Sequence, residues 1–195
     1  MPMNNLLHKK KEFRKKQYKL RKNLYQNIVN IFNETLFEEL FNKINFDNIN
    51  IVSSFVSINT EINTTQLNNY ILNKKKILCL PVVLKKNTHL VFRKYTNENQ
   101  MINGFMNIKE PARTNEVFIP ELLFVPCLAY DNFGFRLGYG GGYYDRTFNH
   151  LKKNNIKFVS VGYAFEDQKV LEVPKDNFDI KLDYVITEKN IYSFL

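Results

Sequence analysis

The chain has 195 residues, of which 44% are hydrophobic and 14% aromatic, so it suits one folded domain and is too apolar to be disordered throughout. Its net charge is +9, and its two cysteines, Cys79 and Cys127, lack the spacing of a zinc site or a disulfide framework. No run approaches the roughly 20 apolar residues of a membrane span, and the polar, basic start does not resemble a signal peptide. We therefore expect a single soluble domain over residues 1–195, monomeric and located in the cytoplasm.

The N-terminal part predicts one long basic helix. Residues 6–32 contain neither Pro nor Gly, and a rough apolar stripe at helical spacing comprises Phe13, Leu20, Leu24, Ile28 and Ile31. Nine Lys or Arg and a single acid lie between positions 9 and 22. This charge fits either an arm that binds nucleic acid or a helix that helps to bind a small anion. Charge alone does not decide between the two interpretations.

Predicted helices and strands alternate along the rest of the chain. Helices are predicted over about residues 34–43, 64–73 with Thr64 as N-cap, and 144–153. Strands are predicted over residues 49–57, 77–84, 89–95, 122–128, 157–163 and 184–187. The nearly all-apolar run at 77–84 is typical of a strand that is covered on both faces. The alternation favours an α/β fold, a single three-layer α/β/α sandwich around a mixed, mostly parallel sheet.

The most informative local signal is RLGYGGGYYDR, residues 136–146, which contains four of the chain's seven glycines. Glycines this dense let backbone N–H groups approach an anion, and the N-terminus of the helix that follows attracts negative charge. The sequence therefore predicts a phosphate-binding loop. It is not a Walker A loop, and Tyr143 stands where the third glycine of a dinucleotide fingerprint would be. A flexible turn is the alternative, but the flanking charges of both signs, Arg136, Asp145 and Arg146, argue against it.

The longer string PCLAYDNFGFRLGYGGGYYDR, residues 126–146, resembles the signature of the 5-formyltetrahydrofolate cyclo-ligase family. Weaker matches follow in order along nearly the whole chain, at Lys10, Arg14, 60–64, 110–111, 165–168, Pro174, Asp179, Asp183 and 187–188. Two departures, Cys127 for a glycine and Tyr130 for a phenylalanine, remove no reacting group. The resemblance implies ATP- and Mg²⁺-dependent conversion of 5-formyltetrahydrofolate to 5,10-methenyltetrahydrofolate. ADP and phosphate would be released through a phosphorylated formyl intermediate, an iminium phosphate.

The same resemblance implies the site residues. ATP, the cosubstrate, would contact Lys10, Arg14, Arg136, Leu137, Gly138, Tyr139, Gly140, Gly141, Gly142, Tyr143 and Tyr144. The folate would contact Val56, Glu61, Tyr139, Gly140, Gly141, Gly142 and Tyr143, with Glu61 accepting hydrogen bonds from the pterin ring. The implied Mg²⁺ ligands are Asp145 and Asp183, since this ion needs only one or two carboxylates beside phosphate oxygens and water. No residue is expected to act as a covalent nucleophile, because phosphoryl transfer depends on alignment and charge neutralisation.

Helical spacing adds Arg21 to this set. It falls within about 40° of Lys10 and Arg14 around the helix axis, so all three side chains can converge on one polyanion. The remaining lysines of the helix either form a solvated face or attract the glutamate tail of a polyglutamylated folate.

Several alternatives stay open at this point. Arg146 either steadies the transferring phosphoryl group or pairs with Asp145. Two rival functions remain beside the cyclo-ligase: a nucleic-acid-binding protein that uses the helix at 9–22, and a cyclo-ligase-like protein with a different substrate.

Overall fold

The computed structural model describes residues 3–27, 32–97 and 101–195, and its centre is an eight-stranded sheet in the order β13-β12-β10-β7-β1-β2-β3-β6. The strands from β12 to β2 are parallel, whereas β13, β3 and β6 pair antiparallel at the edges. The strands of this sheet are β1 (Ile51–Ser53), β2 (Ile77–Val82), β3 (Val91–Lys94), β6 (Val117–Phe118), β7 (Leu122–Pro126), β10 (Val159–Tyr163), β12 (Tyr184–Ile186) and β13 (Ile191–Ser193).

Two small sheets and several helices complete the described part of the chain. The small sheets are the β4–β5 hairpin and the group β11-β8-β9. Their strands are β4 (Met101–Asn103), β5 (Lys109–Pro111), β8 (Ala129–Asp131), β9 (Arg136–Leu137) and β11 (Lys169–Val170). The α-helices are α1 (Met3–Asn27), α2 (Glu34–Lys43), α3 (Thr65–Asn73) and α4 (Tyr143–Lys153), and the 3₁₀ turns are η1 (Phe46–Asn48), η3 (Phe105–Asn107) and η4 (Glu166–Gln168).

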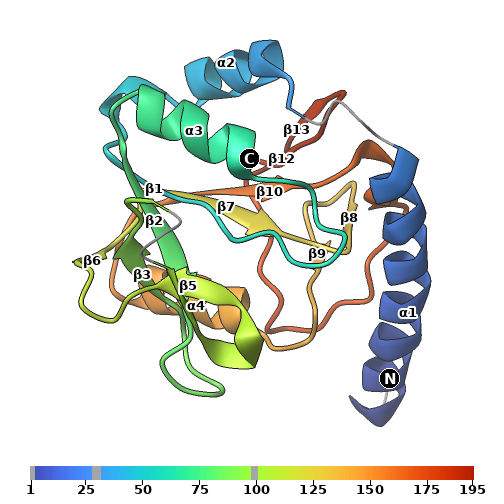
Figure 1. The fold of residues 1–195 in the computed structure, drawn as a ribbon. Coiled ribbons are helices and arrows are strands. Elements are labelled where there is room, and N and C mark those ends of the chain that lie inside the picture. The colour runs from blue at the N-terminus through green and yellow to red at the C-terminus, as the bar shows by residue number, and fades with distance from the viewer. Residues whose placement is uncertain (1–2, 28–31, 98–100) are drawn as a thin grey trace.

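Helices cover both faces of the central sheet. Figure 1 shows α2 and α3 on one face and α4 on the other. Alternate residues of β7 follow this division: Phe124 packs in the core cluster of α2 and α3, whereas Leu123 and Val125 pack in the cluster of α4. This is the period of two that a strand buried on both faces produces. The predicted α/β/α sandwich around a mostly parallel sheet is confirmed.

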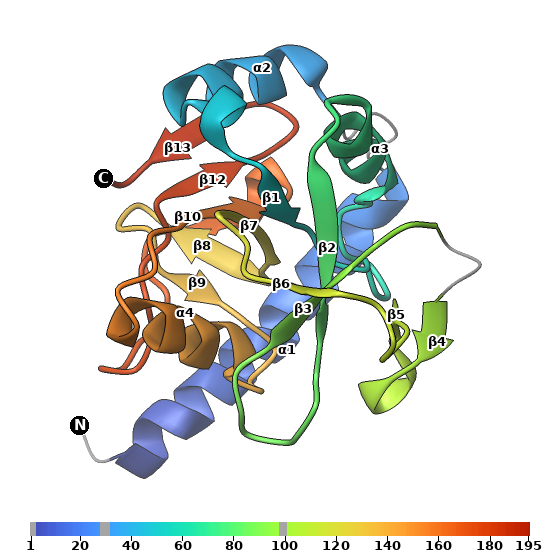
Figure 2. The same cartoon turned by 90° about the vertical axis from the view of Figure 1, so that its left-hand side faces the viewer.

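Helix α1 lies apart from the other helices, at the carboxyl-terminal edge of the parallel strands (Figures 1 and 2). The described helix runs from Met3 to Asn27, residues 28–31 lie outside the described part of the chain, and Phe32 is not helical. The predicted apolar stripe does not form its buried face, because Phe13, Leu20 and Leu24 are only half-buried. The buried side chains of the described helix are instead polar ones: Lys10, Gln17 and Arg21. Helix α1 therefore packs mainly through polar side chains, while Phe13 and Leu24 at the border of this face contact apolar clusters.

The predicted strands are present but shorter, and the N-cap of α3 works differently from the prediction. The strand predicted over 49–57 is reduced to Ile51–Ser53. Thr64 is the N-cap residue of α3, but its hydroxyl donates to the carbonyl oxygen of Phe55 at 2.8 Å instead of capping the helix. The strands missed by the sequence, including β4, β5, β6, β8, β9 and β13, have two or three residues each. Segments this short contain too few side chains to establish an alternation.

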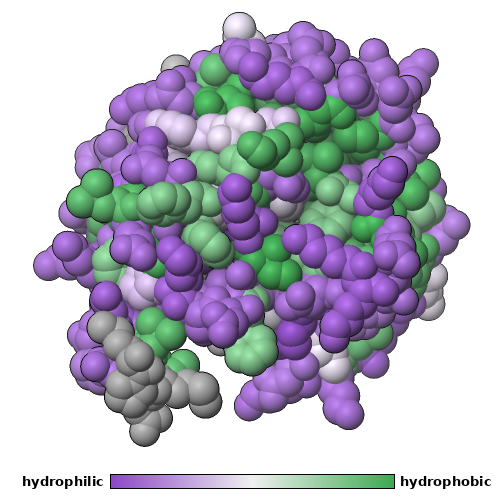
Figure 3. Space-filling model, turned by 180° about the vertical axis from the view of Figure 1, so that it is seen from behind, coloured by the Kyte–Doolittle hydropathy of each residue, from purple (hydrophilic) through white to green (hydrophobic). Residues whose placement is uncertain are grey.

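The two cysteines are free and buried, and burial raises the pKa of each thiol to about 12. Seen from the side opposite to Figure 1, hydrophobic residues lie in separate patches among hydrophilic ones (Figure 3). Within the described residues, no helix has both the length and the apolar character that a bilayer span requires.

Candidate active site

The glycine-rich loop joins β9 to the first turn of α4. Gly140 and Gly142 have φ values of +100° and +64°, in the left-handed region that favours glycine, and Gly142 is the N-cap residue of α4. A Cβ atom on Gly142 would lie 2.7 Å from Nη1 of Arg146. Two positions of the loop therefore require glycine, and the loop backbone lies at the positive end of the α4 dipole.

Strand pairing places this loop at the carboxyl-terminal edge of the central sheet. Strands β8 and β9 follow β7 and pair antiparallel, so that the N–H of Leu128 donates to the carbonyl oxygen of Leu137 at 2.7 Å, directly before the glycines. Glu61 lies in the loop that follows β1 at the same edge. In open α/β sheets, ligands bind outside the carboxyl ends of the strands. The loops that follow β1 and β7 thus form the natural binding edge.

Arg14 connects α1 to the glycine loop. Its Nε donates to the carbonyl oxygen of Gly138 at 2.8 Å. Its guanidinium carbon lies so close to Gly140 that a Cβ atom there would be 3.2 Å away. The side chain is half-buried, so a fixed positive charge borders the loop where the sequence predicted an anion.

Lys10 lies on the same face of α1, but it already has anionic partners. Its Nζ lies 2.7 Å from Oδ2 of Asp176 and 2.5 Å from Oδ2 of Asp179. Burial by itself would lower the pKa of Lys10, but the two carboxylates more than reverse this effect and hold it above the usual value. Lys10 therefore attaches α1 to the segment before β12. Its predicted contact with ATP stays a prediction.

Arg21 is directed to the loop that follows β1. Its Nε donates to the hydroxyl of Thr60 at 3.2 Å, and its Nη1 lies 3.9 Å from Oε1 of Glu61. The guanidinium carbon lies 5.3 Å from the centre of the Tyr139 ring, which belongs to the glycine loop. Lys10, Arg14 and Arg21 thus share one face of α1, as their spacing predicted, while their convergence on one polyanion stays a prediction. Each one has its own partners, however, and Arg21 lies at the predicted folate-binding residue Glu61.

Glu61 is 4% exposed, and Oε2 of its carboxylate accepts a hydrogen bond from the N–H of Ile58 at 2.8 Å. Burial raises the pKa of Glu61, while Tyr139, the Ile58 amide and Arg21 oppose this rise. Val56, the other residue predicted to contact folate from this segment, is half-buried between β1 and Glu61. A buried carboxylate near Tyr139 can bind a planar group rich in N–H donors.

Arg136 and Asp145 form an ion pair beneath the loop. Nη1 of Arg136 lies 3.1 Å from Oδ1 of Asp145, and the same oxygen accepts from the N–H of Ile180 at 3.2 Å. The guanidinium carbon also lies 5.3 Å from the centre of the Phe148 ring. Arg136 therefore ties β9 to α4, whereas Leu137 is buried in a small apolar cluster that includes Phe13 of α1.

The side chains that follow the glycines are aromatic and partly exposed. The guanidinium carbon of Arg146 lies 5.0 Å from the centre of the Tyr143 ring, and Nη2 of Arg146 donates to the carbonyl oxygen of Gly141 at 2.5 Å. The Phe105 ring, at the tip of the β4–β5 hairpin, meets Tyr143 edge-on at 6.1 Å. Asp145, the residue before Arg146, forms its ion pair with Arg136. The predicted alternative in which Arg146 pairs with Asp145 is therefore not observed. No pattern in the sequence predicted that the hairpin tip at Phe105 would lie against the glycine loop.

The two predicted magnesium ligands have different environments. Asp145 lies in the first turn of α4 beside the loop, whereas Asp183 precedes β12, and Oδ2 of Asp183 accepts from the N–H and the hydroxyl of Ser160 at 2.8 and 2.7 Å. The described residues contain no group of three or more His, Cys, Asp or Glu side chains that could hold a metal ion. One or two carboxylates, such as Asp145 and Asp183, suit an ion that takes most of its ligands from phosphate oxygens and water, as Mg²⁺ does. Both carboxylates already have partners, since Asp145 contacts Arg136 and the Ile180 amide and Asp183 accepts from Ser160, so their role as Mg²⁺ ligands stays a prediction.

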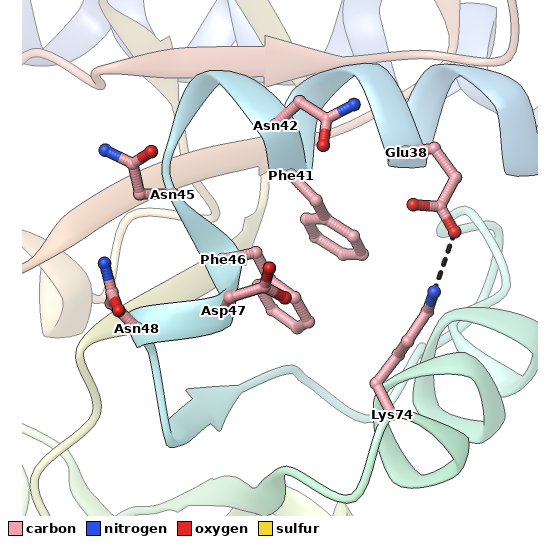
Figure 4. Close-up of a pocket in the computed structure, with 8 residues that line it drawn as sticks. All are labelled: Glu38, Phe41, Asn42, Asn45, Phe46, Asp47, Asn48 and Lys74. Atoms are coloured by element: carbon pink, nitrogen blue, oxygen red, sulfur yellow. Dashed lines mark hydrogen bonds and ion pairs between the residues drawn. The ribbon is translucent and has the colours of Figure 1, made fainter.

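A surface cavity of about 340 Å³ lies elsewhere, between α2, η1 and the end of α3. Figure 4 shows the stacked rings of Phe41 and Phe46 beside it and the ion pair between Glu38 and Lys74 at its side. None of the predicted site residues lines it, and it lies near the amino end of β1. We therefore place the active site at the glycine loop and not at this cavity.

Fold and site together define a class of protein. A mostly parallel sheet carries a glycine loop before a helix N-terminus, with Arg14 at one side and a buried carboxylate, Glu61, at the other. This arrangement fits an α/β enzyme with its ligand site at the carboxyl-terminal edge of the sheet.

Comparison with known proteins identifies the family. Residues 7–188 match the model of the 5-formyltetrahydrofolate cyclo-ligase family. Proteins named 5-formyltetrahydrofolate cyclo-ligase from Escherichia coli K12 and Haemophilus influenzae are 30% identical over 148 residues and 32% identical over 136 residues. These alignments cover 73% and 67% of this chain, and 80% and 72% of the relatives. The chain belongs to the 5-formyltetrahydrofolate cyclo-ligase family and is an enzyme of this class.

Two solved structures of 5,10-methenyltetrahydrofolate synthetases have a similar fold. The 5,10-methenyltetrahydrofolate synthetase of Aquifex aeolicus matches with a TM-score of 0.73 at 28% identity, covering 95% of this chain and 92% of that chain. The synthetase of the same name from Mycoplasma pneumoniae shares the fold, with a TM-score of 0.67 at 17% identity over 92% of this chain and 99% of that one.

One departure from the family signature is accommodated by the structure. Cys127, where the family usually has glycine, is not among the described residues with left-handed backbone, so the turn does not require glycine there. Its carbonyl oxygen accepts from Nε2 of Gln168 at 2.8 Å, which ties the entry of the loop region to η4.

Proposed function

We propose that this protein uses ATP and Mg²⁺ to cyclise 5-formyltetrahydrofolate to 5,10-methenyltetrahydrofolate, with release of ADP and phosphate. The observation that carries the proposal is that α1 joins two loops at one sheet edge. Arg14 hydrogen-bonds Gly138 of the glycine loop, and Arg21 lies beside Glu61 of the loop after β1. A triphosphate at the first loop and a pterin at the second would then lie side by side.

The reaction can be written in two balanced steps. The formyl oxygen attacks the γ-phosphorus of ATP, the bond from phosphorus to the β–γ bridging oxygen breaks, and ADP leaves. N10 of the folate then attacks the activated formyl carbon and loses its proton, and phosphate leaves with the former formyl oxygen. Both steps depend on alignment and on neutralising charge rather than on a protein nucleophile.

The residues of the chain have distinct parts in this proposal. The backbone N–H groups of Gly138 to Gly142 and the N-terminus of α4 bind the phosphates, and Arg14 neutralises part of their charge. Lys10 supports Arg14 by fixing α1 to Asp176 and Asp179. In this proposal Arg136 and Leu137 support the loop from beneath, whereas Tyr144 lines the site.

Folate recognition falls to the other side of the site. Glu61 accepts hydrogen bonds from the donors of the pterin ring, with Val56 lining the same pocket. Tyr139 and Tyr143 provide flat surfaces against which a planar ring can pack. The exposed lysines 15, 16 and 19 lie on the outer side of α1, where they are available to a polyglutamate tail.

Magnesium would be held by Asp145 together with phosphate oxygens, and Asp183 is the proposed second carboxylate. When bound, the ion supplies charge neutralisation for the transferring phosphoryl group. Asp145 lies one helical turn from the glycines, and its Oδ1 is already oriented by Arg136 and the Ile180 amide.

The test is a direct assay. Purified protein is mixed with MgATP and 5-formyltetrahydrofolate, and the near-ultraviolet absorbance of methenyltetrahydrofolate is followed together with ADP. The expected result is an ATP-dependent rise with one ADP per product. No rise, or a rise that is independent of ATP, would overturn the proposal. A nucleic-acid-binding function has less support, because it leaves the glycine loop and the buried carboxylate of Glu61 without a role, although six lysines of α1 are exposed.

A further inference from the structure

Arg21 is a buried cation with unused hydrogen-bonding capacity. It is 0% exposed, yet neither Nη1 nor Nη2 has a hydrogen-bond partner of standard geometry among the described residues. One turn earlier on the same face of α1, Oε1 of Gln17 is also buried and unpaired. Unpaired buried polar groups are rare and cost free energy of folding. The inner face of α1 is therefore not arranged for stability alone.

The guanidinium of Arg21 contacts three separate parts of the chain. Within α1 its Cζ lies 5.6 Å from the centre of the Tyr18 ring, and across the site it lies 5.3 Å from that of Tyr139 in the glycine loop. Its Nε bonds Thr60, and its Nη1 lies 3.9 Å from Oε1 of Glu61. Arg21 thus stands where the proposed nucleotide loop and the proposed folate loop meet.

Arg21 favours the ionised form of Glu61 together with Tyr139 and the Ile58 amide, both of which lower the pKa of Glu61 more than Arg21 does. The titratable side chains that act on it are Arg21 from α1, Tyr139 from the glycine loop, Tyr144 from α4 and Cys127 after β7. Of these, Arg21 alone carries a positive charge at neutral pH. Burial disfavours the ionised form of a carboxylate, and a nearby positive charge favours it.

We propose that Arg21 is a positioning residue for folate recognition: it keeps Glu61 ionised and aligned, and through the Tyr139 ring it ties that carboxylate to the glycine loop. The proposal rests on the proposed function, in which Glu61 accepts hydrogen bonds from the pterin. Arg21 acts through Glu61 and Tyr139 and does not itself touch the reacting atoms. The distance of 3.9 Å between Nη1 and Oε1 is longer than a hydrogen bond. Such contacts often tighten when the substrate binds.

The kinetic test compares Arg21→Met, Arg21→Lys and the exposed neighbour variant Lys22→Met. We expect Arg21→Met to raise KM for 5-formyltetrahydrofolate about tenfold or more, the scale seen when a buried charge pair loses one partner. KM for ATP should change far less. The acid limb of kcat/KM should move to higher pH, because without the cation the pKa of Glu61 rises. Arg21→Lys, which keeps the positive charge, should return the acid limb of the kcat/KM profile to its wild-type pH. Lys22→Met should behave as wild type.

Two kinetic results would overturn the proposal. One is a loss of activity without any movement of the acid limb, which a purely structural role for Arg21 predicts. The other is a rise in KM for ATP as large as that for the folate, which would make Arg21 a nucleotide contact. A wild-type protein without cyclo-ligase activity would refute the proposed function instead, and the inference then depends on the next measurement.

That measurement needs no turnover. Thermal unfolding is followed against pH for wild type, Arg21→Met, Glu61→Gln and the double variant. A carboxyl group whose pKa is higher in the folded than in the unfolded protein stabilises the fold at low pH. For Glu61 this stabilisation is complete below the unfolded pKa, 4.5, and is lost as pH rises through the folded pKa. Arg21→Met should therefore lose Tm relative to wild type as the pH rises above this value. In the Glu61→Gln background this pH dependence should vanish, and its persistence there would refute the link between Arg21 and Glu61.

Discussion

The Nε of Arg14 donates a hydrogen bond of 2.8 Å to the carbonyl oxygen of Gly138, although 124 positions separate the two residues in sequence. This bond attaches the N-terminal helix to the first glycine of the loop. It also places a fixed positive charge beside Gly140, whose left-handed backbone turns the loop. The loop and the helix are therefore held together at one edge of the sheet.

Arg14→Met should weaken ATP binding. A hydrogen bond to a charged group contributes about 1.5–3 kcal/mol, so we expect KM for ATP to rise about tenfold or more. KM for 5-formyltetrahydrofolate should change much less, since Glu61 lies on the other loop. Steady-state kinetics at saturating co-substrate measures both values. Lys11→Met, which removes an exposed charge from the same helix, is the control. Equal kinetics for the Arg14 variant and this control would exclude Arg14 from the ATP site.

Gly140→Ala should destabilise the loop. The residue has φ of +100°, and an added Cβ would lie 3.2 Å from Arg14. A left-handed backbone costs a non-glycine residue about 1–2 kcal/mol, which corresponds to a fall in Tm of roughly 2–8 °C for a chain of this size. Gly138→Ala is the matched control, because its Cβ meets nothing within 4 Å. Differential scanning calorimetry compares the two, and equal Tm values would contradict the assignment of strain to position 140.

Asp145→Asn should cripple turnover while the fold is preserved. The amide keeps the size of the side chain and loses its charge, so we expect kcat to fall about 100-fold or more, as for other removed electrostatic contacts. The Mg²⁺ concentration that gives half-maximal rate should rise. Magnesium titrations of activity, with Asp167→Asn as the exposed control, measure both effects. An unchanged kcat and unchanged Mg²⁺ dependence would remove Asp145 from the metal site, and the same titration of Asp183→Asn decides its role.

Lys10→Met should lower stability in a defined pH window. The pKa of Lys10 is raised in the folded protein. Its contribution to the free energy of unfolding is therefore complete below the unfolded pKa of 10.5 and is lost as pH rises through the folded pKa. Burial by itself would raise the pKa of Asp176, but Lys10 and two backbone amides hold it below 3.8, so this contribution is lost as pH falls through the folded value. The loss of stability in the variant, about 1–3 kcal/mol, should be constant between these limits.

Denaturant unfolding of wild type, Lys10→Met and the exposed control Lys9→Met from pH 3 to pH 9 checks this window. The difference between wild type and Lys10→Met should shrink at the acid end, as pH falls below 3.8 towards the lowered pKa of Asp176. A difference that stays the same at pH 3 would show that Lys10 stabilises the protein by packing and not through its ion pairs.

Local sequence was sufficient for the elements with strong patterns and for the loop. The helix at 34–43 has the predicted bounds, since its apolar residues Phe37, Leu40 and Phe41 repeat at helical spacing and bury against the sheet. The glycines at 140 and 142 proved to need their left-handed conformations. In contrast, the apolar stripe of α1 predicted its buried face only in part: Phe13 and Leu24 pack against apolar clusters, but the fully buried side chains of the described helix are polar.

The sequence by itself determined the family, the α/β order of elements and the glycine loop, because these depend on residues that are close together in the chain or on a specific motif. Only the tertiary structure decided which partner each charge has: Lys10 with Asp176 and Asp179, Arg14 with Gly138, Arg21 with Glu61, and Arg136 with Asp145. Ion pairs act over a few ångströms between residues that the parallel sheet brings to one edge from distant parts of the chain. Spacing along a helix can show that several cations share a face, but it contains no information about what that face meets.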